Sequence, residues 1–223
     1  MNEERAGTPG SRLRSVLWSG DASARLQAAL TAGTDPQPAY IDVLVARCGV
    51  EPDFFVRDML TWALTRHDRA STVDAVLPEL RSESAQSRSQ ALHTLSKIGE
   101  PDTWSAITGD LLHDDDVEVA RAAWRTAVGL VPVGHEAELA RKLAAQLGRG
   151  DRETQLSLSR ALAALGHAAE PVVETEAHSE DPAVSTHAVA TLAIMADADE
   201  GFDAAIAEAK RVVALRAAPA VTE

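Results

Sequence analysis

Several features that mark other classes of protein are scarce in this sequence of 223 residues. Aromatic residues make up 4% of it, and Cys48 is the single cysteine. No apolar run approaches the roughly 20 residues that cross a bilayer, and the first residues lack the charged-then-apolar pattern of a signal peptide. One cysteine excludes an internal disulfide and a cysteine-rich zinc site. These absences predict a cytoplasmic protein that does not use a membrane.

Basic residues are missing from one long segment. The chain carries 21 Lys and Arg against 34 Asp and Glu, a formal charge of −13. Between Arg160 and Lys210 there is no Lys or Arg, while ten acidic residues fall there. Nucleic acids and anionic membranes attract Lys and Arg, so both are disfavoured as partners. The acidic C-terminal part favours instead a protein partner with a basic surface.

A repeated pattern occupies most of the chain. Helix-breaking clusters recur about every 33 residues, and the first three are Arg66-His67-Asp68, Gly99-Glu100-Pro101 and Val131–Gly134. Between clusters, apolar residues follow helical spacing twice, with a smaller break near the middle of each period. The sequence therefore predicts five helical hairpins, over residues 38–67, 68–100, 101–133, 134–167 and 168–200.

Apolar stripes and caps support each hairpin. The first hairpin has one stripe at Ile41, Leu44, Val45 and Cys48, and a second at Phe55, Val56, Met59, Leu60, Ala63 and Leu64. The third has Trp104, Ile107 and Leu111, followed by Val117, Ala120, Trp124, Ala127 and Val128. We expect Asp116, Asp151 and Asp181 to cap the helices that follow them, and Gly99 and Gly166 to close helices.

The two ends of the array are expected to differ from its middle. A pair of helices is predicted over residues 11–32, with Leu13, Val16, Leu17, Leu26, Ala29 and Leu30 on the apolar stripes. A closing helix is predicted over 201–216, with Phe202, Ile206, Ala209 and Val213 facing inwards. Residues 1–10 and 217–223 read as disordered tails.

These patterns together predict an all-α fold. One hairpin cannot bury both of its stripes alone, whereas stacked hairpins bury a continuous core. No stretch alternates in the manner of a strand. We therefore expect a right-handed α-solenoid of about five hairpins, with an N-terminal helical pair and a C-terminal capping helix, in one domain over residues 11–216.

Short motifs at the starts of the second helices resemble those of HEAT repeats. Asp181-Pro182-Ala183-Val184 resembles the second-helix signature, and Asp116-Val117-Glu118-Val119 looks like a weaker copy. In that family an arginine normally follows the valine. Val56-Arg57 keeps this pair, whereas Ala120 and Ser185 stand in the arginine position. The resemblance extends over most of the predicted array and implies a curved, non-catalytic scaffold that holds a partner protein on a concave face lined by second helices.

A DNA-repair enzyme is the first alternative. Alkylpurine DNA glycosylases of similar length have a HEAT-like fold and use Trp, Asp and Arg around a basic groove, and Trp62, Trp104 and Trp124 are available here. The missing basic residues over 161–209 argue against this function, and a tryptophan on a helical stripe more often packs in the core. A basic inner groove with an exposed Trp beside an Asp would favour the enzyme over the scaffold.

The other chemical alternatives have weaker support. HEAT-like bilin lyases have no local signature that separates them from a scaffold, and Cys48 on an apolar stripe predicts a buried thiol. HEAT-like hydroxylases that hold two irons use repeated His-Glu pairs, but His135-Glu136 is a single pair. The run His113–Asp116 lacks the alternating spacing of a calcium loop. We expect no metal, no cofactor and no catalytic residue.

Arginines recur at similar phases of successive second helices, at Arg57, Arg88 and Arg121. Two hypotheses remain open: a column that grips acidic groups of a partner, or ion pairs between repeats with carboxylates such as Asp58, Asp74 or Glu118. The candidate contact residues for a protein partner are Arg57, Trp62, Arg88, His93, Arg121 and Arg125. We expect a monomer or a weak dimer.

Overall fold

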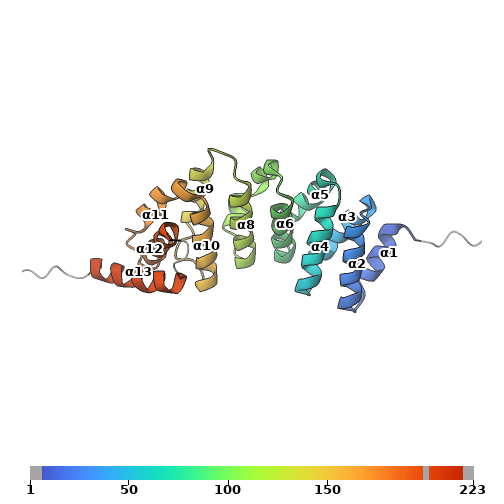
Figure 1. The fold of residues 1–223 in the computed structure, drawn as a ribbon, viewed down its shortest axis with the longest axis horizontal. Coiled ribbons are helices and arrows are strands. Elements are labelled where there is room, and N and C mark those ends of the chain that lie inside the picture. The colour runs from blue at the N-terminus through green and yellow to red at the C-terminus, as the bar shows by residue number, and fades with distance from the viewer. Residues whose placement is uncertain (1–6, 198–200, 218–223) are drawn as a thin grey trace, which may run out of the picture. The chain divides into compact units, whose positions relative to one another are not determined.

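The computed structural model describes residues 7–197 and 201–217, and within these residues every regular element is helical (Figure 1). The ordered contacts fall into two compact units, residues 1–107 and 108–223, which are described separately. The sequence alone predicts one domain over 11–216. Of the helices in the described ranges, none has both the length and the apolar character that a membrane crossing requires.

Unit 1 consists of three helical pairs in two layers. The first helices are α1 (Pro9–Leu17), α3 (Ile41–Cys48, preceded by the 3-10 turn η1, Pro38–Tyr40) and α5 (Arg69–Val76, continued by η2, Leu77–Arg81). The second helices are α2 (Ala22–Thr34), α4 (Phe54–Arg66) and α6 (Ala85–Ile98), which lie side by side (Figure 1). Because each helix contacts its counterpart in the next pair, the pairs stack in chain order.

Unit 2 repeats this layering. After the turn η3 (Pro101–Ala106), which belongs to unit 1, the first helices are α7 (Gly109–Leu112), α9 (Glu136–Ala144) and α11 (Glu170–Glu176, preceded by η4, Gly166–Ala168). The second helices are α8 (Val117–Leu130), α10 (Arg152–Ala164) and α12 (Pro182–Ala196), and α13 (Phe202–Ala217) packs on α12. The all-α solenoid architecture is therefore confirmed.

The predicted caps are confirmed. The Asp116 carboxylate accepts hydrogen bonds from the backbone N–H groups of Glu118 and Val119, and Asp151 and Asp181 cap α10 and α12 in the same way. These bonds satisfy N–H groups that have no partner inside a helix. Gly99 closes α6 with a φ of 69°, a left-handed conformation that glycine adopts without steric cost.

Three stripe predictions were wrong by one helical position. Phe55 is 72% exposed, Val16 is 42% exposed and Leu30 is 39% exposed. In α4 the core face is formed by Val56, Leu60, Ala63 and Leu64. A neighbouring residue is turned by about 100° around the helix, so Phe55 points to solvent.

The helix ends also differ from prediction at two places. The first helix begins at Pro9 rather than at residue 11, because Thr8 caps it and Pro9 fits the first turn. The first helix of the third hairpin is replaced by η3 and the short α7, separated by Ile107 and the extended residue Thr108. The remaining residues of the predicted tails, 1–6 and 218–223, lie outside the described residues, as does part of the predicted break at 197–199.

Close packing of α2 on α4 depends on Gly33. A Cβ atom at Gly33 would lie 2.3 Å from the Trp62 ring and 2.9 Å from the Ala63 Cα. We predict that Gly33→Ala lowers the free energy of unfolding by about 1–3 kcal/mol, because the helices must separate to admit the methyl group. Denaturant unfolding followed by circular dichroism measures this change.

The matched control is Gly129→Ala in α8, where a Cβ would meet no atom within 4 Å. This variant should gain about 0.5–1 kcal/mol from reduced backbone freedom in the unfolded chain. Equal effects of the two substitutions would show that the α2–α4 contact is looser than described.

Candidate partner-binding site

Arg57 and Arg88 occupy equivalent positions at the starts of α4 and α6. Each follows its N-cap residue, Asp53 or Ser84, by four positions. The Arg57 Nη1 donates to the carbonyls of Glu51 and Pro52, both at 2.8 Å. The Arg88 Nη1 donates to the carbonyls of Ser82 and Glu83, at 2.9 and 3.1 Å. Each guanidinium therefore holds the loop that leads into its own helix.

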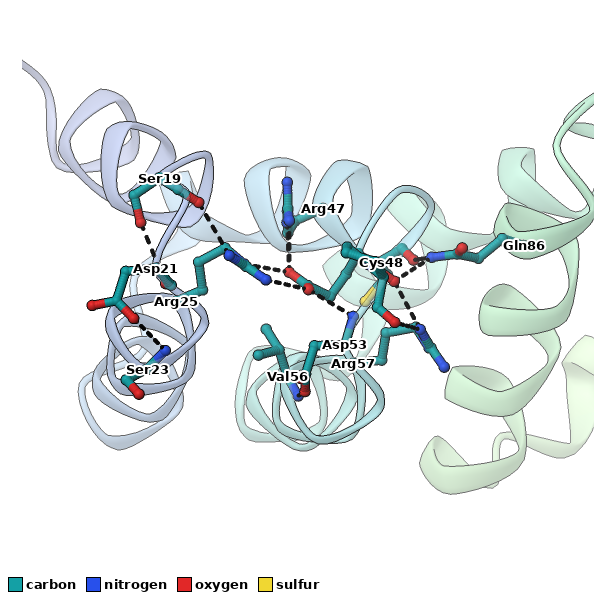
Figure 2. Close-up of polar contacts among 12 residues, drawn as sticks. Ser19, Asp21, Ser23, Arg25, Arg47, Cys48, Asp53, Val56, Arg57 and Gln86 are labelled. Atoms are coloured by element: carbon teal, nitrogen blue, oxygen red, sulfur yellow. Dashed lines mark hydrogen bonds and ion pairs between the residues drawn. The ribbon is translucent and has the colours of Figure 1, made fainter.

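The loop before α4 is held from several directions (Figure 2). Glu51 is fully buried, and its carboxylate accepts from Arg25 at 2.8 and 2.9 Å and from Arg47 at 2.7 and 2.8 Å. The Gln86 amide, from α6, donates to the carbonyls of Cys48 and Glu51. Burial alone would raise the pKa of Glu51, but these arginine hydrogen bonds and the backbone N–H of Asp53 hold it below its usual value.

Neighbouring loops show how the chain compensates when that arginine is absent. Ala120 stands at the equivalent position of α8, and Arg149, from the loop before α10, donates instead to the carbonyls of Asp114 and Asp115. In α10 the position is taken by Gln155, whose amide lies 3.5 and 3.4 Å from the carbonyls of Gly148 and Gly150. In each of the loops that precede α4, α6, α8 and α10, a side chain therefore donates to at least one backbone carbonyl.

Arg121 differs from Arg57 and Arg88. It follows its cap, Asp116, by five positions and so is turned by about 100° around the helix. Its Nη1 lies 2.8 Å from Glu118 and 3.8 Å from Glu153 of α10. The Glu118 pair lies within α8 and only the longer Glu153 contact joins two repeats, whereas Arg57 and Arg88 bind carbonyls that neither hypothesis named.

The remaining predicted contact residues divide between the units. Trp62 on α4 is 37% exposed, and its ring edge lies against Gly33. His93 is half-buried on α6 of the same unit. Arg125 is exposed on α8, in unit 2.

A concave feature of unit 2 lies between α8 and α10 and encloses about 420 Å³. Its charged lining consists of Arg121 and Arg125 from α8, and Arg152, Glu153 and Arg160 from α10; its apolar lining includes Val128, Leu156 and Ala161. We call this feature the arginine groove. Four of its lining residues are arginines and one is a glutamate, in a chain whose formal charge is −13.

The four arginines differ in how they are paired. Arg152 donates to the Asp203 carboxylate of α13 at 2.8 Å, and Arg121 pairs with Glu118 as above. The Arg121 Nε makes no hydrogen bond. Arg125 and Arg160 are exposed and have no hydrogen bond or ion pair within the described part of the chain.

Sequence reasoning named Arg121 and Arg125 but missed Arg152 and Arg160. Their signal was present: Arg152, Leu156 and Arg160 follow one another at intervals of four, so they share one face of α10.

A DNA glycosylase would be favoured by a basic groove with an exposed tryptophan beside an aspartate, and the arginine groove has only the first of these features. It is basic, but neither a tryptophan nor an aspartate lines it. Trp124, on the same helix as Arg125, is fully buried, and its Nε1 donates to the Leu112 carbonyl at 2.8 Å. Trp124 is therefore a core residue.

Cys48 is a buried thiol, as predicted. Burial and the nearby Glu51 charge raise its pKa to about 12, so the nucleophilic thiolate does not form near neutral pH. The space beside it encloses about 10 Å³, about the size of one water molecule. Within the described ranges, no three His, Cys, Asp or Glu side chains are grouped to hold a metal ion.

The structure also brings together a serine and a histidine that are far apart in sequence. The Ser159 hydroxyl lies 3.0 Å from the His187 Nε2 and 2.8 Å from the Thr191 hydroxyl, and all three side chains are buried. The His187 Nδ1 accepts from the Gly148 N–H, so Nε2 carries the proton and can donate to the Gln155 carbonyl. In a catalytic triad the histidine nitrogen beside the serine is unprotonated and accepts the serine proton. Here that nitrogen carries a proton, so His187 cannot activate Ser159 as a base.

Comparison with known proteins identifies part of this architecture. Residues 41–129, from α3 to the last turn of α8, match the family model for HEAT repeats. No curated protein matches the sequence.

Two solved structures are similar in outline. The crystal structure of an engineered protein has 20% identity and a TM-score of 0.46, over 84% of this chain and 96% of that chain. The complex of CpcE and CpcF of phycocyanin lyase from Nostoc has 16% identity and a TM-score of 0.37, over 96% of this chain and 97% of that chain.

The buried Glu51 gives a prediction for unit 1. Glu51→Gln should lower the free energy of unfolding by about 3–5 kcal/mol, because it leaves Arg25 and Arg47 buried without a counter-charge. Glu83→Gln, at an exposed position in the next loop, is the control and should change stability by less than about 0.5 kcal/mol. Urea denaturation compares the two, and equal losses would contradict the network.

His187 gives a prediction of pH dependence for unit 2. Burial lowers its pKa from 6.5 to about 4, an effect that the Gln155 carbonyl only partly opposes. Below pH 6.5 the unfolded chain binds a proton at this histidine that the folded chain does not bind. The contribution of His187 to the free energy of unfolding is therefore fully present above pH 6.5 and declines towards pH 4. The loss attributable to this group is about 3 kcal/mol.

The measurement is the unfolding free energy from urea denaturation between pH 7 and pH 4. His187→Asn should be less stable at neutral pH but should show a shallower decline, whereas exposed His178→Asn should keep the original decline. An unchanged decline in His187→Asn would disprove the assignment.

Proposed function

We propose that this HEAT-repeat chain is a non-catalytic scaffold that binds a partner protein, with the arginine groove between α8 and α10 as a contact surface. The observation that carries the proposal is the pair Arg125 and Arg160, two exposed cations in one groove that make no ion pair with any residue the structure describes. Arginine is enriched at protein interfaces, where its planar group binds carboxylates through two hydrogen bonds.

Electrostatic cost supports a binding role for the groove. The arginines that line the groove repel one another. Glu118 and Glu153 offset the charge of Arg121, and Asp203 offsets that of Arg152, whereas Arg125 and Arg160 have no ion pair within the described residues. Such a cluster lowers the stability of the free protein. Proteins commonly keep such locally destabilising groups where a surface binds another molecule.

The chemistry of the described polar clusters supports the absence of catalysis. The Cys48 thiol is protonated and enclosed, and the Ser159–His187 pair is buried with its proton on the wrong nitrogen for a base. A single buried thiol also suits the reducing cytoplasm, where we place the scaffold as a monomer or weak dimer.

Other candidate contacts remain part of the proposal. The ten acidic residues between 161 and 209 favour a basic patch on the partner, which would lie outside the arginine groove. In unit 1, the side chains of Trp62 and His93 are partly exposed on the second helices. Arg57 and Arg88 each use the Nη1 atom to donate hydrogen bonds to loop carbonyls.

An affinity pull-down from a native lysate, read by mass spectrometry, tests the scaffold. The bait is the full chain, compared with the double variant Arg125→Glu and Arg160→Glu and with the control Arg141→Glu, an exposed arginine of α9 outside the groove. We expect the wild type and the control to enrich the same partner and the double variant to lose it. No enriched protein, together with oligonucleotide binding at physiological salt, would overturn the function.

A further inference from the structure

We infer that the occupant of the arginine groove is a short, acidic, amphipathic helix of the partner protein. This inference rests on the proposed function and adds the chemistry of the bound segment. Three properties of the groove carry it: the spacing of its arginines, the weakness of their internal pairing and the apolar residues between them.

The spacing of the arginines matches that of acidic residues on a helix. Arg121 and Arg125 are four residues apart on α8, and Arg152 and Arg160 are eight apart on α10 with Leu156 between them. At 1.5 Å per residue these rows extend over roughly 6 and 12 Å. Carboxylates four residues apart on a helical ligand repeat at the same interval, so one ligand can meet successive arginines.

The internal carboxylates leave the arginines available. Arg121 pairs with Glu118 at 2.8 Å and more distantly with Glu153 at 3.8 Å, and Arg152 pairs with Asp203; all three carboxylates are more than half exposed. Exposed pairs of this kind contribute little to stability, so an incoming carboxylate can replace them at low cost. Arg125 and Arg160 need no such exchange, because they have no partner within the described residues.

Apolar side chains lie between the charged rows. Val128 and Leu156 are half-buried, and Ala161 is buried, on the inner surfaces of α8 and α10. Apolar residues on the same face of the ligand helix would cover them. A groove that combines apolar and cationic residues therefore favours an amphipathic acidic helix over a free inorganic anion.

Nucleic acid is the competing polyanion, and the groove suits it less. Single-stranded nucleic acid is usually held by aromatic side chains that stack on bases, but no aromatic residue lines the groove. The sequence after Arg160 is free of Lys and Arg up to Lys210 and would repel a phosphate backbone extending in that direction.

Fluorescence anisotropy with synthetic probes tests the inference directly. The probe is a capped, fluorescein-labelled alanine-based helix with glutamates four residues apart on one face and leucines beside them. The control peptide has glutamine in place of every glutamate. The full-length wild type should bind the acidic peptide at least about tenfold more tightly than the control, and binding should weaken as salt is added.

Two opposite changes in the protein sharpen the test. Arg125→Gln with Arg160→Gln should weaken binding of the acidic peptide about tenfold or more, because it removes the two cations that need not exchange partners. Glu153→Gln should strengthen binding severalfold, because it removes the one carboxylate that lines the groove and competes with the ligand. Arg141→Gln changes the same charge outside the groove and should leave the affinity unchanged. Circular dichroism and thermal unfolding check that each variant is folded.

The outcomes separate the inference from the proposed function. Equal binding of the acidic and control peptides, or tighter binding of a labelled single-stranded DNA that the same arginine substitutions abolish, would overturn the inference. If the peptides fail but the pull-down partner still depends on Arg125 and Arg160, the scaffold stands and the acidic helix is wrong. If both experiments fail, the proposed function itself is wrong.

Discussion

The loops that precede α4, α6, α8 and α10 share one constraint: their backbone carbonyls need hydrogen-bond donors, and a side chain supplies one in each loop. These carbonyls follow the end of one helix and precede the next, so they lack helical hydrogen-bond partners. Arg57 and Arg88 satisfy them from within their own helices, whereas Arg149 satisfies the loop before α8 from the following repeat. This requirement separates arginines that hold loops from arginines such as Arg125 and Arg160, which line a groove and make no hydrogen bond or ion pair with the residues described.

The large-scale fold could be predicted from the sequence because it follows from spacing. A helical hairpin period of about 33 residues, with Asp116, Asp151 and Asp181 at helix starts, determines which segments pair and stack. The errors occurred where a neighbouring residue has similar hydrophobicity but a different angle around the helix, as for Phe55 beside Val56. Periodicity alone cannot separate two apolar residues that are adjacent in sequence.

The candidate site was less predictable because it depends on packing between helices. Sequence spacing placed Arg57, Arg88 and Arg121 at similar phases, but the cap positions put Arg121 one residue further along its helix. Whether a side chain meets a carbonyl, a carboxylate or solvent depends on the neighbouring helix. Arg152 and Arg160 became candidates only when α10 was placed beside α8, and His187 met Ser159 only through the packing of α12 on α10.

We propose the face between α8 and α10 as the binding surface, and an NMR titration tests this proposal most directly. Backbone amide spectra of the isotope-labelled full chain are recorded as the acidic helical peptide is added. The account predicts that the largest shift changes fall on residues of α8 and α10, around Arg125 and Arg160. Changes concentrated instead around the exposed Phe54 and Phe55 of α4, or spread evenly over the chain, would contradict it.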